Sequence, residues 1–307
     1  MKLVSYHHPI SGSSVGLRTS ATQLLDLRPL FAGIGSGQSA IRRLLQAFDG
    51  VPDFSQSDLK GLHSVSIDDV DIEPMVPDPT KVIAAPVNYR DHQQEMNEDY
   101  GIEALGIFLK APSSVLRHGG TVVLPYTDRR FDQEGELAVV IGRTARFVDV
   151  DDALTYVAGY TCCLDMTMRG GEDRSTRKSF ETFTPVGPQL VTPDEVDDLS
   201  RLRLRTTVNG TLRQDADIAD LIWGIPELLS YASSVMTLHP GDIITTGTPA
   251  GIGQIADGDT VSVEIDRIGV LSVSVSSAGA VSCPTLGARR GPVPPPEVTP
   301  VRPRTSA

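Results

Sequence analysis

The 307-residue sequence lacks any long hydrophobic run. Its longest apolar stretches, residues 137–142 and 82–87, are the size of strands, whereas a membrane-spanning helix needs about 18 apolar residues. The start of the chain also lacks the uninterrupted apolar stretch of about 7–15 residues that a secretory signal contains. We therefore expect a protein without a membrane partner and without a secretory signal.

Cysteine and positive charge are also scarce. Cys162 and Cys163 are adjacent and Cys283 stands alone, which does not suggest a disulfide framework. A reducing cytoplasm is therefore the simplest compartment for this chain. The 27 basic side chains are outnumbered by 39 acidic ones, which gives a net charge of −12. This charge opposes binding to a polyphosphate backbone, so nucleic acid is not an expected partner.

The patterns along the chain predict three regions. Residues 1–75 mix short apolar runs with Ser, Gly and Asp, contain one predicted helix at residues 39–48, and are expected to form a small N-terminal domain. Residues 76–283 are rich in short β-branched runs, with one longer helix predicted at residues 225–236. Residues 284–307 hold 7 of the 22 prolines and are predicted to be a disordered, Pro- and Arg-rich tail. Many short strands with few long helices favour a β-rich α+β fold.

Two acids, Glu134 and Glu136, precede a predicted strand. If the extended conformation reaches back to Glu134, the alternation of side chains places both carboxylates on one face. Two like charges side by side are unfavourable unless they are neutralised, and a divalent cation that prefers oxygen ligands does this well. A solvated strand edge is the alternative.

A third acid, Asp165, closes the apolar stretch of residues 156–164. An acid at the end of a buried strand must be paired, hydrogen-bonded or ligated to a metal. Capping of the following turn is its alternative role.

His92 and Glu95 are neighbours if the short polar segment around them is helical. A carboxylate beside an imidazole fixes the tautomer of the ring and raises its basicity, as a general base requires. An exposed pair on a surface helix is the alternative.

Further along the chain, a predicted strand leads into the glycine-rich residues 247–253. The backbone N–H groups of such a loop can bind an anion, and a plain tight turn is the alternative.

Six segments in the order of the chain resemble successive motifs of the fumarylacetoacetate hydrolase family. The segments are NYRDHQQE, GIFLKAPSS, EGELAVVIG, GYTCCLDMTMR, RKSFETFTPVGP and GDIITTGTPAGIG. The resemblance covers roughly residues 76–275. It implies a catalytic domain with a mixed β-roll, a small N-terminal α/β domain and assembly as a homodimer.

The resemblance also implies the parts of an active site. Glu134, Glu136 and Asp165 correspond to the ligands of Mg²⁺ or Mn²⁺, and His92 with Glu95 corresponds to the base dyad.

Further residues of the same motifs are expected to contact the substrate. Lys178 is expected beside the metal and the substrate oxyanion, whereas Arg169, Lys110 and Thr248 are expected to hold substrate oxygens. The sequence departs from the family pattern at Glu172, where an acid stands at a position that often carries an amide, and the connection of residues 170–177 is shorter than in many relatives. These differences leave the identity of the substrate open.

The activity implied by the resemblance is hydrolysis of a C–C bond in an acylpyruvate-type 1,3-dioxo acid. A 2-oxo acid chelates the metal, which polarises the keto group and stabilises an enolate. His92 draws a proton from water, the hydroxide attacks the distal carbonyl, and Lys178 shares the charge of the departing pyruvate enolate. The same site also suits an isomerase of the 2-hydroxyhepta-2,4-diene-1,7-dioate type or an oxaloacetate decarboxylase. A catalytically silent protein that binds metal or a small molecule is the alternative from another class.

Overall fold

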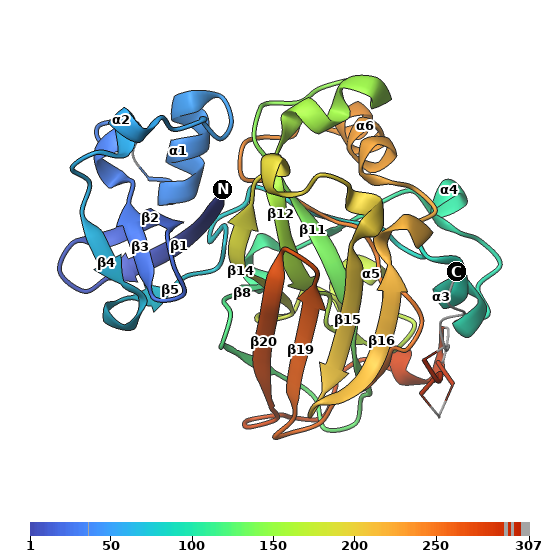
Figure 1. Cartoon of the computed structure of the whole chain (residues 1–307). Helices are drawn as coiled ribbons and strands as arrows, with labels where there is room; N and C mark the ends of the chain where they lie inside the picture. Colours follow the sequence, from blue (N-terminus) through green and yellow to red (C-terminus); the bar gives the residue numbers. More distant parts are fainter. Residues whose placement is uncertain (36, 292–293, 296–297, 302–307) are drawn as a thin grey trace.

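A 12-stranded sheet links the N-terminal region to the rest of the chain (Figure 1). The computed structural model describes residues 1–35, 37–291, 294–295 and 298–301. The main path of the sheet runs in the order β4, β3, β2, β1, β14, β12, β11, β17, β6 and β7. In that order the strands are Ser64–Ser66, Gln23–Asp26, Gly12–Arg18, Lys2–His8, Thr184–Val191, Val157–Leu164, Gly135–Ile141, Ile243–Thr245, Val82–Ala84 and Phe108–Lys110. Off this path, β5 (Asp71–Ile72) pairs with β1, and β8 (Val115–Leu116) pairs with β14.

Two smaller sheets complete the β structure. A five-stranded sheet has the order β16, β15, β19, β20 and β9, and a three-stranded sheet has the order β13, β10 and β18. The strands of the five-stranded sheet, in that order, are Thr211–Asp217, Arg203–Val208, Thr260–Ile265, Gly269–Ser276 and Thr121–Val123. Those of the three-stranded sheet are Thr167–Met168, Phe131–Gln133 and Gly253–Gln254. Most pairs are antiparallel, but β17 with β6, β14 with β8 and β20 with β9 are parallel. This mixed, β-rich α+β architecture confirms the expected fold class.

Helices are short and lie around the sheets (Figure 1). The α-helices α1 to α6 are Ala40–Phe48, Gln56–Leu59, Arg90–Glu95, Ile102–Leu105, Arg174–Arg177 and Ile225–Val235. The 3₁₀ helices η1 to η8 are Arg28–Phe31, Ile67–Asp69, Pro112–Ser114, Val150–Tyr156, Pro193–Glu195, Leu199–Arg201, Ile218–Asp220 and Gly287–Arg289. α1 and α6 match the two predicted helices to within a residue at each end. No helix in the described ranges is both long and apolar enough to cross a membrane.

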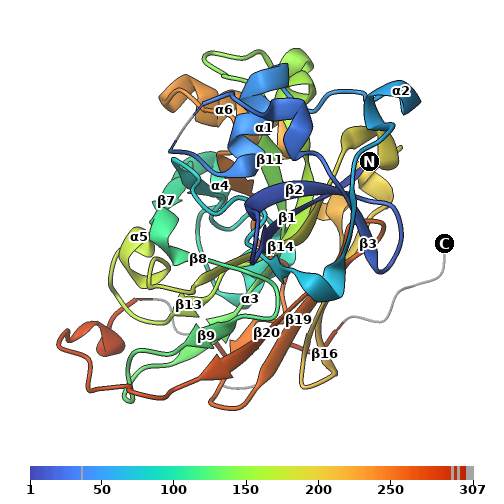
Figure 2. The same cartoon turned by 90° about the vertical axis from the view of Figure 1, so that its left-hand side faces the viewer.

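The N-terminal region shares its sheet with the rest of the chain. β1 pairs with β14 through Lys2 opposite Val191 and Leu3 opposite Leu190, and Figure 2 shows these strands side by side. The boundary predicted near residue 75 therefore does not divide the sheet.

The beginning of the predicted tail contacts the region of residues 76–283. Residues 284–291 include η8, and the backbone N–H of Gly171 donates to the carbonyl of Gly287 at 2.9 Å. The Arg130 guanidinium also donates to the carbonyl of Pro295 at 3.3 Å. These contacts differ from the disorder expected for the whole tail. Residues 292–293, 296–297 and 302–307, which belong to the same prediction, lie outside the described residues.

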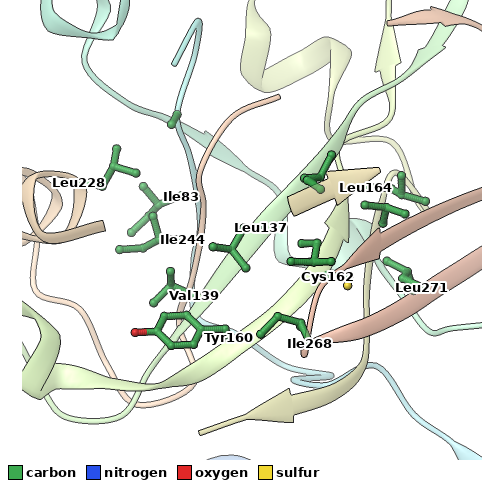
Figure 3. Close-up of a cluster of buried hydrophobic side chains, with 14 of the residues drawn as sticks. Ile83, Leu137, Val139, Tyr160, Cys162, Leu164, Leu228, Ile244, Ile268 and Leu271 are labelled. Carbon is green, nitrogen blue, oxygen red and sulfur yellow. The ribbon is translucent and has the colours of Figure 1, made fainter. Parts of the chain in front are cut away.

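The strand β11 is buried on both of its faces. Leu137 and Val139 face the large core cluster that Figure 3 shows, together with Ile244 of β17. The alternate residues Ala138 and Val140 belong instead to the cluster under the N-terminal region. A strand covered on both faces carries apolar side chains on both, which explains the continuous apolar run from Leu137 to Ile141.

We predict that Leu137→Ala destabilises the fold by about 2–5 kcal/mol, since Leu137 is fully buried and its loss leaves a cavity. Urea unfolding measures this change. Leu286→Ala is the matched control because that side chain is 89% exposed. A loss of less than about 1 kcal/mol in Leu137→Ala would contradict the packing described here.

Candidate metal and substrate site

Three buried carboxylates converge where β11 begins and β12 ends. Glu134 precedes β11, Glu136 lies within it, and Asp165 directly follows β12. Each residue offers one carboxylate oxygen, and these three atoms lie within 4.8 Å of one another. The side chains are buried, with residue exposures of 4%, 2% and 1%. The structure thus brings together the three acids that the sequence analysis proposed as metal ligands.

The backbone around Gly135 fixes this convergence. The N–H of Asp165 donates to the carbonyl of Glu134 at 2.8 Å, which ties the end of β12 to the start of β11. Gly135 packs so closely against the five-stranded sheet that an added Cβ would lie 2.0 Å from Oγ1 of Thr206. Its N–H donates to Oε1 of Gln214 at 2.8 Å. A glycine between the two glutamates therefore lets the sheets approach at the site.

Lysine side chains hold two of the carboxylates in place. Nζ of Lys178 donates to Glu134 Oε2 at 2.7 Å and to Asp165 Oδ2 at 2.6 Å. Nζ of Lys110 donates to Asp165 Oδ1 at 2.5 Å and to the carbonyl of Phe183 at 2.9 Å. Lys110 is thus placed behind Asp165, where it orients a carboxylate, and its expected contact with a substrate oxygen stays a prediction.

Arg169 contacts both Glu134 of the cluster and Asp132, a buried acid that the sequence analysis missed. Its Nη2 donates to Glu134 Oε1 at 2.6 Å and its Nε to Asp132 Oδ2 at 2.7 Å. Asp132 is fully buried and also accepts from Arg130 Nε at 2.7 Å. The same alternation that linked Glu134 to Glu136 extends back to Asp132, so the spacing already contained this information.

The carboxylates differ in their affinity for protons. Burial alone would raise the pKa of Glu134, but the charges of Lys178 and Arg169 outweigh burial and hold that pKa well below its usual range. Burial, followed by the charge of Asp165, raises the pKa of Glu136 to about 8, although Glu136 Oε2 accepts the N–H of Gly247 at 2.9 Å. The resident cations thus do not fully neutralise the third carboxylate. A set of three oxygen donors with this charge fits a hard divalent cation such as Mg²⁺ or Mn²⁺.

The predicted His–Glu pair is present on α3. Nδ1 of His92 lies 2.9 Å from Glu95 Oε2, and Glu95 Oε1 accepts the N–H of Gly251 at 2.9 Å. His92 is only 7% exposed and lines the same pocket as the carboxylates. Because Nδ1 is engaged by Glu95, Nε2 is the ring nitrogen left for proton transfer.

Asn88 anchors the segment that leads into α3. Its Nδ2 donates to the carbonyls of Trp223 and Thr246 at 2.9 and 2.8 Å, and its Oδ1 accepts the N–H of Trp223 at 2.8 Å. Gly247 has a φ of +88°, and an added Cβ would lie 2.8 Å from Cβ of Asn88. The glycine-rich loop and the base of the helix that carries His92 are therefore packed directly together.

The three carboxylates and His92 line one pocket. Of the nine predicted site residues, seven line it, while Glu95 and Lys110 stand behind His92 and Asp165. Thr248 lines the pocket, but its hydroxyl already donates to the carbonyl of Gly135 at 2.9 Å and accepts from Gln214 Nε2 at 2.7 Å. Lining residues that the sequence analysis did not single out are Ala85, Pro86, Val87, Met96, Glu98, Phe108, Arg174 and Arg177.

The unusual acid Glu172 is engaged outside this pocket. Its carboxylate accepts from the Arg129 guanidinium, with one contact at 3.4 Å, and from the hydroxyl of Thr285. Glu172 therefore connects the loop after Arg169 to the start of the tail and is not part of the described pocket lining.

Comparison with known proteins agrees with this site. Residues 81–276 match the family model described as fumarylacetoacetate (FAA) hydrolase C-terminal. The chain is 45% identical over 230 residues to a maleylpyruvate hydrolase of Aquipseudomonas alcaligenes, covering 71% of this chain and 80% of the relative.

Solved structures extend the similarity to most of the chain. The maleylpyruvate hydrolase of Sphingobium sp. SYK-6, in complex with manganese(II) and pyruvate, aligns with a TM-score of 0.78 and 38% identity over 90% of this chain and 99% of that one. The 2-hydroxyhepta-2,4-diene-1,7-dioate isomerase of Mycobacterium marinum aligns with a TM-score of 0.72 and 30% identity over 91% of this chain and 99% of that one. The chain belongs to the fumarylacetoacetate hydrolase family.

Proposed function

We propose that this family member is a divalent-metal-dependent hydrolase that cleaves a C–C bond in an acylpyruvate-type 1,3-dioxo acid. The observation that carries the proposal is one pocket that holds both the carboxylates of Glu134, Glu136 and Asp165 and the imidazole of His92. Similarity to two maleylpyruvate hydrolases, one of them in complex with manganese(II) and pyruvate, supports it.

The three carboxylates would hold Mg²⁺ or Mn²⁺, and the 2-oxo acid end of the substrate would lie against this site. When bound, the ion supplies Lewis-acid polarisation of the 2-oxo group and offsets the negative charge that develops as the bond breaks. Lys178 and Arg169 orient the carboxylates through the hydrogen bonds described above.

The proton transfers are assigned to the His92–Glu95 dyad. His92 Nε2 takes a proton from water, and the resulting hydroxide adds to the carbonyl carbon distal to the 2-oxo group. The bond from that carbon to the neighbouring CH₂ group then breaks, and its electron pair passes to the pyruvate unit as an enolate. The imidazolium returns its proton to the enolate carbon, which yields pyruvate and the second acid. Glu95 orients the ring and stabilises the charged imidazolium, and Lys178 keeps an ammonium close to the developing charge.

Isomerisation is the second candidate, because the chain also resembles a 2-hydroxyhepta-2,4-diene-1,7-dioate isomerase. It requires proton transfer between carbon atoms and no attack by water.

Assembly as a homodimer stays a prediction. So does a reducing cytoplasm, which the unpaired, buried thiols of Cys162 and Cys163 support.

We expect the Mn²⁺-loaded protein to convert an acylpyruvate to pyruvate and the corresponding acid, measured by chromatography of the products. Oxaloacetate and 2-hydroxyhepta-2,4-diene-1,7-dioate, offered separately, test the decarboxylase and isomerase alternatives. Chelation should abolish turnover and added Mn²⁺ should restore it. Turnover of the diene acid alone would replace the hydrolase by the isomerase, and binding of all three compounds without turnover of any would favour a silent binding protein.

We expect Mn²⁺ affinity to rise with pH until about pH 8. Glu136 in the metal-free protein binds a proton below its raised pKa of about 8, and the ion must displace that proton, so affinity falls as the pH is lowered. Glu136→Gln has nearly the same shape but no proton to lose. It should weaken Mn²⁺ binding by more than about 100-fold and flatten this part of the pH dependence. Isothermal titration calorimetry measures both. Unchanged affinity in Glu136→Gln would remove Glu136 from the ligand set.

We expect His92→Gln to lower kcat by about 10²–10⁴-fold, the usual contribution of a general base, with Mn²⁺ affinity unchanged. Glu95→Gln should lower kcat in the same direction, because it removes the charge that stabilises the imidazolium. Steady-state kinetics and metal titration of both variants test the dyad. A full kcat in His92→Gln would assign the base to another group.

A further inference from the structure

Arg177 is a buried cation that lines the pocket of the metal-site carboxylates. It is the last residue of α5, is 8% exposed, and lines the same pocket as the metal-site carboxylates. In the described part of the chain, no carboxylate forms an ion pair with its guanidinium. A buried charge is costly unless it is paired, so such a group calls for an anion beyond those that the described residues supply.

The neighbouring cations differ from Arg177 in this respect. Lys178 and Arg169 both form ion pairs with Glu134, and Arg174 lies 3.6 Å from the carboxylate of Glu98. Burial, followed by the like charge of Arg169, lowers the pKa of Arg177 to about 10, which still leaves it charged at neutral pH. Glu134 and Asp165 act on this pKa in the opposite direction, but neither forms an ion pair with the guanidinium.

The formal charge of the pocket points to a substrate with two negative charges. Its lining holds four acids, namely the three carboxylates of the metal site and Glu98, and four bases, namely Arg169, Arg174, Arg177 and Lys178. A bound divalent cation therefore leaves two positive charges in excess. A monocarboxylic 2-oxo acid would neutralise one of them, and a dicarboxylic one would neutralise both.

We propose that Arg177, beside Arg174, binds a second carboxylate at the acyl end of the substrate and thereby selects dicarboxylic over monocarboxylic acylpyruvates. The planar guanidinium presents two parallel N–H donors that match a carboxylate. The apolar side chains of Val87, Met96 and Phe108 in the same lining suit the carbon chain between the two ends. The inference rests on the proposed function, because it takes the 2-oxo acid end to lie at the metal site.

Two 2-oxo acids of equal length that lack the cleavable 1,3-dioxo group test this subsite by equilibrium binding. 2-Oxoheptanedioate carries the distal carboxylate, and 2-oxoheptanoate has a methyl group in its place. We expect calorimetry on the Mn²⁺-loaded protein to show about 10- to 100-fold tighter binding of the dicarboxylate. Arg177→Gln should remove that preference and leave the affinity for 2-oxoheptanoate within about twofold. Arg177→Lys should recover part of it.

Arg201→Gln is the matched control, because that side chain is 86% exposed. Thermal melting and Mn²⁺ titration establish that each variant is folded and binds the metal. Equal binding of the two acids by the wild type would overturn the proposal. An equal loss for both acids in Arg177→Gln would also overturn it, because that result places the guanidinium at the 2-oxo acid end.

Kinetics separate this inference from the proposed function. With a dicarboxylic acylpyruvate, Arg177→Gln should raise KM by about 10-fold or more, and with acetylpyruvate it should leave KM nearly unchanged. If the wild type cleaves neither compound, the proposed hydrolase activity is wrong. The difference in affinity between 2-oxoheptanedioate and 2-oxoheptanoate still shows whether Arg177 binds a second carboxylate.

Discussion

Repulsion among three buried carboxylates is the constraint on which the site depends. The hydrogen bond between Asp165 and Glu134 in the backbone brings two of these acids together, and the pleat of β11 adds Glu136. Lys178, Lys110 and Arg169 compensate part of the charge, and the remainder favours a divalent cation. The fold thus holds together groups that would separate in a flexible chain.

The rigidity of this arrangement comes from the position of β11 between two cores. Leu137 and Val139 pack on one side and Ala138 and Val140 on the other. A one-residue shift in register would exchange these side chains between two closely packed cores and would also reverse the face on which Glu136 lies. The N-terminal region contributes to this because it covers one face of β11. It therefore supports the site although none of its residues lines the described pocket.

Local patterns predicted the parts of the site, but not all of their partners. Alternation placed Glu134 and Glu136 on one face, and helical spacing placed His92 beside Glu95, because both relations lie within a few residues. The pairing of β1 with β14 and the contact of Glu172 with Thr285 join segments far apart in the chain, and no local period encodes them. The position of Lys110 behind Asp165 and the buried position of Arg177 likewise depend on tertiary packing. Assignment to the family came from the order of six motifs.

The C-terminal segment contacts the loop after Arg169 and thereby reaches one wall of the pocket. Thr285 and Gly287 brace residues 171 and 172, and the same short loop continues into α5, which carries Arg174 and Arg177. The part of the pocket wall that carries Arg174 and Arg177 is therefore held in place partly by contacts made outside the pocket. The C-terminal segment thus belongs to the framework of the site although Thr285 and Gly287 do not line the pocket.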